Sequence, residues 1–286
     1  MSPSPHDAAP EDVAPHVAAP DDTAPDTALD DTAPGAPAAE HPLVGVLGGV
    51  GPLATVSFLD AVVRLTEAER DQDHVDLVVL QHATIPDRTA HILGASAEDP
   101  GPVMAEDARR LERWGAGFVV VPCNTAHHYT AQIAAAVDVP VVSIVGETTA
   151  AAVARRPGLR AAAVLATEGT VAAGVYQRAL EAAGVRALVP DAAGQAVVTS
   201  AIYDGVKAGA AVDLPALLAV AEGLLAQGAE VVLLGCTELS VVAEGAGLLD
   251  DPRFVDSLDA LARSTITRAG HRLRERRAPN PAAAGR

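Results

Sequence analysis

The chain has 286 residues and a formal net charge of −17 at pH 7, which leaves room for one large domain or two small ones. This acidic balance disfavours binding to nucleic acid or to an anionic membrane surface. Hydrophobic residues make up 49% of the chain and aromatic residues only 2%, so Ala, Val and Leu must fill the core. No charge-free apolar stretch of about 18 residues is present, so a membrane-spanning helix is not expected.

The two ends of the chain differ in composition from the middle. Residues 1–41 consist mainly of Ala, Pro, Asp and Thr, with nine acidic side chains and no Lys or Arg. Frequent prolines and little apolar surface predict a disordered tail there, and a second one at residues 278–286. The N-terminus has no positive segment ahead of an apolar core, so we expect no secretory signal and a cytoplasmic location.

Between the tails, short apolar runs alternate with amphipathic segments. The runs predict strands at Leu43–Gly48, Val75–Gln81, Gly117–Cys123, Val139–Ile144, Arg160–Ala166 and Ala229–Cys236. The amphipathic segments predict helices at Ala54–Ala68, Val103–Trp114, Thr125–Ala136, Thr148–Ala154, Val171–Ala183, Val197–Ala208, Leu214–Gln227 and Val255–Arg274. Such alternation is typical of parallel sheets covered by helices, so the predicted fold class is α/β.

The two halves of the chain are similar in layout. The first strand of each half leads through a Gly-containing turn into a helix, and each half carries one cysteine. We therefore predict a duplicated unit with two pseudo-symmetric domains and an active site in the cleft between them. The first α/β domain comprises residues 42–140, completed by a C-terminal helix at 251–274, and the second comprises residues 141–250.

Both cysteines end an apolar run in the same local pattern. Cys123 follows the run 118–122 and Cys236 follows the run 231–235, and a helix start is predicted just after each. Open α/β sheets bind ligands at this edge. Two thiols in matched settings favour a pair of acid/base groups, one for each face of a substrate carbon. A helix N-terminus lowers the pKa of a thiol and so promotes this role.

Other interpretations of the cysteines carry less weight. Buried cysteines are common as small apolar core residues. A structural disulfide is disfavoured, because a chain of this length does not need one.

Five motifs together resemble aspartate racemase, in the aspartate/glutamate racemase superfamily. They cover the chain from about Leu43 to about Arg268 and comprise residues 48–55, 85–89, 122–127, 165–170 and 235–239. The resemblance implies two pseudo-symmetric α/β domains, catalysis by Cys123 and Cys236, no cofactor and a homodimer. Racemisation needs a base on one face of the α-carbon and an acid on the other, which explains the two thiols.

The same resemblance suggests which residues bind substrate. Backbone N–H groups after each cysteine would hold the α-carboxylate, and Arg88 and Lys207 would hold a side-chain carboxylate. Alternatively, Arg88 and Lys207 are solvated, Asn124 and the threonines are helix caps, and His127 and Glu238 either tune the thiols or stabilise packing. The full predicted substrate-binding set is Arg88, Asn124, Thr125, Thr167, Lys207, Thr237, Glu238 and Gly51.

Several functions are disfavoured. The turn at Gly48–Gly51 lacks the spacing of a dinucleotide fingerprint, and the adjacent His127 and His128 cannot easily share a metal. The Asp-Ser-Gly turn typical of glutamate racemases is absent here. Val50 stands where the family usually has methionine, which leaves the substrate size open.

We therefore predict an amino-acid racemase that interconverts L- and D-aspartate by a two-thiol mechanism, without pyridoxal phosphate or metal. Its expected partner is a small, dicarboxylic amino acid rather than nucleic acid or membrane. One alternative is a racemase or epimerase of broader specificity. The other is a non-catalytic amino-acid-binding protein of the same fold.

Overall fold

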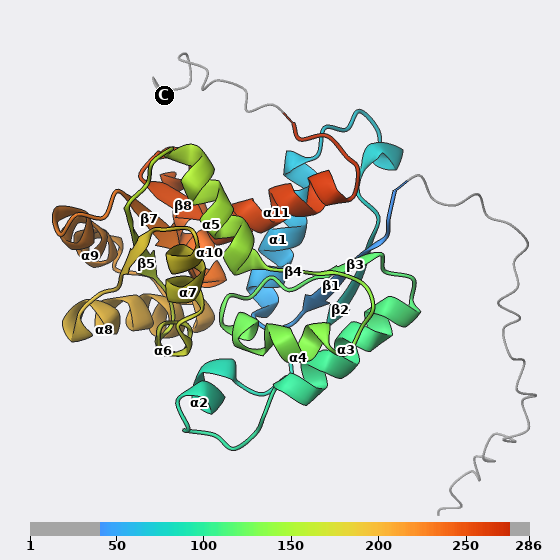
Figure 1. Cartoon of the computed structure of the whole chain (residues 1–286), viewed down its shortest axis with the longest axis horizontal. Coiled ribbons are helices and arrows are strands. Elements are labelled where there is room, and N and C mark those ends of the chain that lie inside the picture. Colours follow the sequence, from blue (N-terminus) through green and yellow to red (C-terminus); the bar gives the residue numbers. More distant parts are fainter. Residues whose placement is uncertain (1–40, 275–286) are drawn as a thin grey trace, which may run out of the picture. The chain divides into compact units, whose positions relative to one another are not determined.

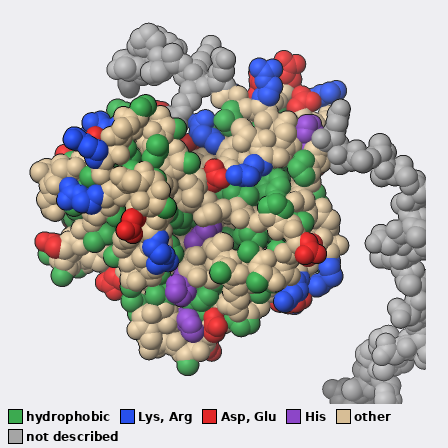
Figure 2. All heavy atoms as spheres, viewed as in Figure 1, with side chains coloured by type: hydrophobic (Ala, Val, Ile, Leu, Met, Phe, Trp, Pro, Cys, Tyr) green, Lys and Arg blue, Asp and Glu red, His purple; other side chains and the backbone are tan. Residues whose placement is uncertain are grey.

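The structure is a computed structural model that describes residues 41–274 (Figure 1). The predicted tails, residues 1–41 and 278–286, lie outside the described residues except for His41. None of the helices within the described range is both long and apolar enough to cross a bilayer. On the face shown in Figure 2, Lys and Arg side chains are interspersed with Asp and Glu side chains and form no continuous basic surface.

The described residues form two four-stranded sheets, and all strand pairs are parallel. The first sheet has the order β2-β1-β3-β4, with β1 at Val44–Gly48, β2 at Leu77–Gln81, β3 at Phe118–Val120 and β4 at Val141–Val142. The second has the order β6-β5-β7-β8, with β5 at Ala161–Leu165, β6 at Arg186–Leu188, β7 at Val231–Leu234 and β8 at Phe254–Asp256. Both sheets have the same strand topology, and the predicted fold class is confirmed.

Helices cover both sheets (Figure 1). They are α1 (Pro52–Leu65), α2 (Arg88–Ile92), α3 (Gly101–Arg113), α4 (Thr130–Ala134), α5 (Ile144–Arg155), α6 (Glu168–Ala173), α7 (Val175–Ala182), α8 (Ala192–Ser200), α9 (Leu214–Ala226), α10 (Thr237–Gly245) and α11 (Ser257–Arg268). Short 3₁₀ turns lie at Asp71–Asp73, Thr125–Tyr129 and Leu248–Asp250, and a π-helix, η3, at Ala201–Lys207.

Several predicted elements are wrong in detail. The predicted helix 171–183 is two helices, because Gly174 adopts a left-handed conformation with φ of 66° between α6 and α7. The start of the predicted helix Val255–Arg274 is instead strand β8, which pairs with β7. The second sheet therefore extends past residue 250, where the sequence placed the end of the second domain. Strand β6 and helix α2 were not predicted, and of α10 only the start, just after Cys236, was predicted.

Helix α11 contacts helices that belong to both halves of the chain. It packs against α1, which follows the first sheet's strand β1, and against α5, which precedes the second sheet (Figure 1). The buried cluster around it contains Val44 and Phe58 from the first half, and Val164 and Leu233 from the second. The two sheets therefore share one buried cluster next to α11.

Candidate active site

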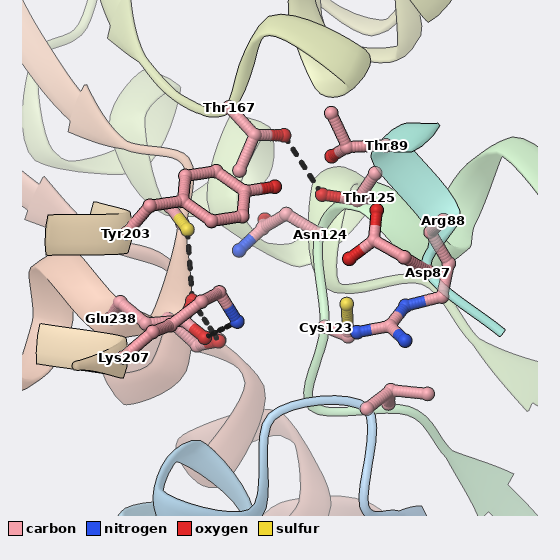
Figure 3. A pocket seen from close by; sticks show the side chains of 13 residues that line it. Asp87, Arg88, Thr89, Cys123, Asn124, Thr125, Thr167, Tyr203, Lys207 and Glu238 are labelled. Carbon is pink, nitrogen blue, oxygen red and sulfur yellow. Dashed lines mark hydrogen bonds and ion pairs between the residues drawn. The ribbon is translucent and has the colours of Figure 1, made fainter. Parts of the chain in front are cut away.

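One pocket collects side chains from both halves of the chain, most of them in turns that follow the carboxyl ends of strands (Figure 3). Its lining comprises Val50, Asp87, Arg88, Thr89, Cys123, Asn124, Thr125, Thr167, Tyr203, Lys207, Cys236, Thr237 and Glu238. Nine of the ten predicted site residues line it. The tenth, Gly51, is at its edge: a Cβ there would lie 3.1 Å from Glu238 Oε1.

The Cys123 turn follows strand β3 and is held by a buried histidine. The carbonyl oxygen of Cys123 lies 2.8 Å from His127 Nδ1, and the Ile144 N–H donates to His127 Nε2 at 3.1 Å. Nδ1 therefore carries the proton and donates, and burial lowers the pKa of this imidazole. His127 thus fixes the backbone of the turn, through the carbonyl oxygen of Cys123 rather than its thiol. The helix expected after Cys123 begins as a five-residue 3₁₀ turn.

The Cys236 turn follows strand β7 and has a different environment. Cys236 is the N-cap residue of α10, and its Sγ donates to Glu238 Oε2 at 2.9 Å. Burial raises the pKa of the thiol, and the Glu238 carboxylate raises it further. The expectation that a helix start would lower this pKa is therefore wrong for Cys236. The dipole of one helix end is a small contribution beside desolvation and a neighbouring negative charge.

Glu238 also forms an ion pair with Lys207, across the pocket wall between α10 and η3. Burial opposes ionisation of both groups, but their mutual attraction outweighs it. The pKa of the Glu238 carboxyl is lowered and that of the Lys207 ammonium is raised. Both are charged at neutral pH, so the charge of Lys207 is neutralised within the protein.

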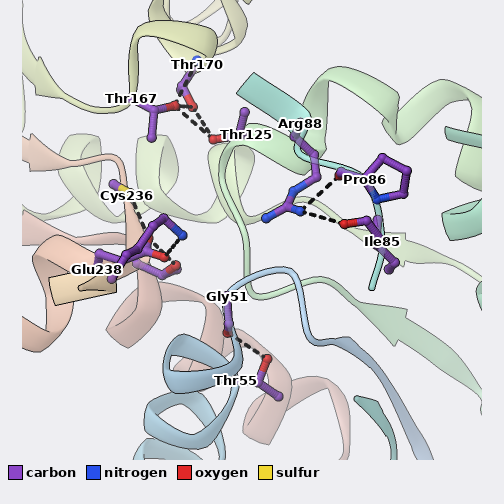
Figure 4. A network of polar contacts seen from close by, with 12 residues as sticks. Gly51, Thr55, Ile85, Pro86, Arg88, Thr125, Thr167, Thr170, Cys236 and Glu238 are labelled. Atoms are coloured by element: carbon purple, nitrogen blue, oxygen red, sulfur yellow. Dashed lines mark hydrogen bonds and ion pairs between the residues drawn. The ribbon is translucent and has the colours of Figure 1, made fainter. Parts of the chain in front are cut away.

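Arg88 has no such carboxylate partner within residues 41–274. It begins α2, and its Nη1 donates to the carbonyl oxygens of Pro86 at 3.1 Å and of Ile85 at 3.4 Å (Figure 4). Its Nε is buried without a hydrogen-bond partner. Figure 3 shows the guanidinium on the same side of the pocket as Cys123. A planar guanidinium with an unused donor is suited to a carboxylate.

The predicted threonine ligands are partly engaged with one another. The hydroxyl oxygens of Thr125, Thr167 and Thr170 lie 2.9 Å apart in each pairing, which links the two halves (Figure 4). Thr167 also caps α6 by accepting the Thr170 N–H at 3.1 Å. Thr237 begins α10, and its hydroxyl lies 3.5 Å from Glu238 Oε2.

Three lining residues were missed by the sequence analysis: Asp87, Thr89 and Tyr203. Asp87 and Thr89 flank Arg88 in its motif, and Asp87 caps α2 by accepting the Ala90 N–H at 2.7 Å. Tyr203 lies four residues before Lys207, whose Nζ is 5.7 Å from the tyrosine ring centroid. A four-residue spacing on one helix face was the available signal. Within the described range, no cluster of His, Cys, Asp and Glu has the arrangement of a metal site.

The fold is an α/β arrangement of two parallel sheets, each followed by one cysteine turn, and comparison with known proteins identifies the family. Residues 47–265 match the Asp/Glu/Hydantoin racemase family. The chain belongs to that family and is an isomerase of the racemase class.

Three relatives illustrate the match. The chain is 28% identical to the broad specificity amino-acid racemase RacX of Bacillus subtilis (strain 168), over 79% of this chain and 97% of that protein. It is 29% identical to an aspartate racemase from Picrophilus torridus, with a TM-score of 0.69 over 82% of this chain and 96% of the other. An aspartate racemase homologue from Pyrococcus horikoshii OT3 shares the fold, with 23% identity and a TM-score of 0.64 over 79% of this chain and 98% of the other.

Proposed function

We propose that this protein interconverts L- and D-aspartate by proton transfer between two cysteines, without a cofactor. The observation that carries the proposal is the composition of one small pocket. Two cysteine turns from separate sheets line it together with Arg88, a cation without a carboxylate partner in the described part of the chain. Thiols supply the acid and the base, and Arg88 supplies selectivity for a side-chain carboxylate.

The environment of Cys236 suggests its starting protonation state. Cys236 is held as a neutral thiol by burial and by its hydrogen bond to Glu238. In one direction, a Cys123 thiolate takes the α-proton and becomes a thiol, while Cys236 gives its proton to the opposite face and becomes a thiolate. The reverse reaction starts from this second state. The Lys207 charge beside Glu238 offsets part of the cost of the Cys236 thiolate.

Binding of the α-amino acid would draw on groups from both halves. Free N–H groups at the start of α10, which has nine residues, favour an α-carboxylate. Asn124, Thr125 and Thr237 provide further hydrogen-bonding groups along the pocket wall. Arg88 would bind the distal carboxylate. Lys207 would bind this carboxylate only after its ion pair with Glu238 has broken.

That last point favours a second candidate, a racemase of broad amino-acid specificity. With Lys207 paired to Glu238, the pocket presents one unpaired cation among its lining residues instead of two. Val50 also trims the wall where the related motif has a longer side chain. Under this hypothesis, Arg88 contributes little to the choice of substrate.

The decisive experiment is α-proton exchange in deuterated water, followed by mass spectrometry, with aspartate, glutamate and alanine in both configurations. We expect exchange and inversion with aspartate, and loss of inversion in Cys123→Ala and in Cys236→Ala. Equal turnover of alanine and aspartate would favour the broad-specificity candidate. Absence of exchange with every amino acid would overturn the proposed activity.

We also propose that the protein is a cytoplasmic homodimer, as its family resemblance suggests. Helix α1 supports the dimer, because Leu53, Val56 and Val63 on its outer side are 50%, 53% and 51% exposed. Spaced at three and seven residues, they share one helix face. An apolar face of this kind is suited to a second copy of the chain.

A further inference from the structure

Tyr176, in α7, is fully buried and touches both cysteine turns. Its hydroxyl donates to Asn124 Oδ1 at 2.6 Å, and Asn124 directly follows Cys123. Its ring lies against Gly235, which directly precedes Cys236: a Cβ at Gly235 would be only 2.8 Å from the ring atom Cε2. One rigid side chain therefore spans from the first half's cysteine turn to the second's.

The hydrogen bonds around Asn124 fix the orientation of its amide. Burial raises the pKa of Tyr176, so its hydroxyl stays protonated and acts as the donor. The other end of the amide is also held, because Asn124 Nδ2 donates to Ser257 Oγ at 3.0 Å. Because Oδ1 faces the tyrosine and one Nδ2 hydrogen is bonded to Ser257, the second Nδ2 hydrogen can donate to a group bound in the pocket that Asn124 lines.

We infer that Tyr176 is a positioning residue that sets the spacing and orientation of the two cysteine turns. This rests on the proposed two-cysteine racemisation. In that reaction, Cys123 accepts the α-proton as Cys236 donates one to the opposite face. Both sulphur atoms must be aligned with the same carbon in the same bound state. If one thiol is misplaced, the other can still remove the α-proton, but delivery of a proton to the opposite face of the carbon is delayed.

The ring and the hydroxyl of Tyr176 have separable effects. The ring limits how closely the Gly235 backbone can approach, and glycine is required there because any side chain would collide with it. The hydroxyl connects this contact to the Asn124 amide in the other half. Tyr176→Phe removes the connection and keeps the ring, so it changes the alignment with little loss of packing.

The test compares the parent with Tyr176→Phe in deuterated water, starting from L-aspartate. The matched control is Thr265→Val, which removes another fully buried hydroxyl bond, to the Leu261 carbonyl at 2.8 Å on α11. We expect kcat of Tyr176→Phe to fall about tenfold with a much smaller change in KM, since misalignment affects the chemical step. We also expect more deuterium in the recovered L-aspartate, because the thiol that took the α-proton has time to exchange it for a solvent deuteron and return that deuteron before the opposite thiol delivers one.

A second variant, Ser257→Ala, removes the other bond to the Asn124 amide and should give the same pattern. If the melting curve shows that Tyr176→Phe does not fold, the kcat and deuterium content of Ser257→Ala provide the test. Parent-like kcat and parent-like deuterium content in the folded variants would overturn the inference, as would an equal change in Thr265→Val. A parent that exchanges no amino acid would instead overturn the proposed function, and the inference with it.

Discussion

The hydrogen bond from Cys236 to Glu238 makes a prediction about pH. A carboxylate beside a thiolate is a like-charge contact, so its removal stabilises the thiolate and lowers the pKa of the thiol. Glu238→Gln also frees Lys207, whose positive charge acts in the same direction. We expect the pKa of Cys236, measured by thiolate absorbance in a Cys123→Ser background, to fall in Glu238→Gln.

The control for this titration is Glu244→Gln, which changes a second glutamate on α10. Glu244 is exposed, and its carboxylate forms an ion pair with Arg64 instead of contacting a thiol. Its substitution should leave the Cys236 titration unchanged. A Cys236 pKa that is the same in Glu238→Gln and in the parent would contradict the assigned cause.

The second residue-scale prediction concerns Arg88. Arg88→Ala should cost about 2–5 kcal/mol of transition-state binding for aspartate, the range for a desolvated charge pair that loses one partner. Alanine, which has no side-chain carboxylate, should lose much less. The measurement is kcat/KM for both substrates, with Arg109→Ala as a control, because Arg109 is exposed and pairs with Glu106 on α3. An equal loss for both substrates would make Arg88 a structural residue.

At the scale of elements, helix α2 carries Arg88 and rests on α6. The contact is close: a Cβ at Gly169 would lie 2.8 Å from the Thr89 Cα, a backbone atom that cannot turn aside. We expect Gly169→Ala to push α2 away and to raise KM for aspartate more than for alanine.

The matched control for this change is Gly223→Ala in α9, where an added Cβ meets no atom within 4 Å. In that helix interior the substitution should stabilise the fold by about 0.5–1 kcal/mol, without a change in KM. Identical kinetic effects of the two substitutions would show that the α2–α6 contact does not set the position of Arg88.

The elements also show what the sequence can and cannot predict. Long apolar runs such as 229–236 predicted strands correctly, whereas β6 and β8 each include a charged residue and lie outside such runs. The two cysteines were predictable because each follows the carboxyl end of a strand, whereas Arg88 and Lys207 were predicted only from the family resemblance. The Lys207–Glu238 pair, 31 positions apart, and the Tyr176–Asn124 bond, 52 apart, were not. Both depend on how the elements pack in three dimensions.

At the scale of the whole molecule, the proposed dimer predicts an effect of surface charge. A lysine in place of Val56 puts an ammonium group in the centre of the exposed apolar face of α1. If that face contacts a second copy, Val56→Lys should lower the mass measured by light scattering from that of two chains to that of one, 28.9 kDa. The control is Val79→Lys on strand β2, 37% exposed in the parent. A parent that is already monomeric would rule the dimer out.

The repeated strand topology has a kinetic consequence. The position two residues after the cysteine is Thr125 in the first half and Glu238 in the second, so the duplicated turns are chemically unequal. The two enantiomers have equal free energy in water, so their equilibrium constant is unity and the Haldane relation requires equal kcat/KM in both directions. Any steady-state difference between the halves must therefore take the form of a larger kcat for one enantiomer, offset by a proportionally larger KM for that same enantiomer.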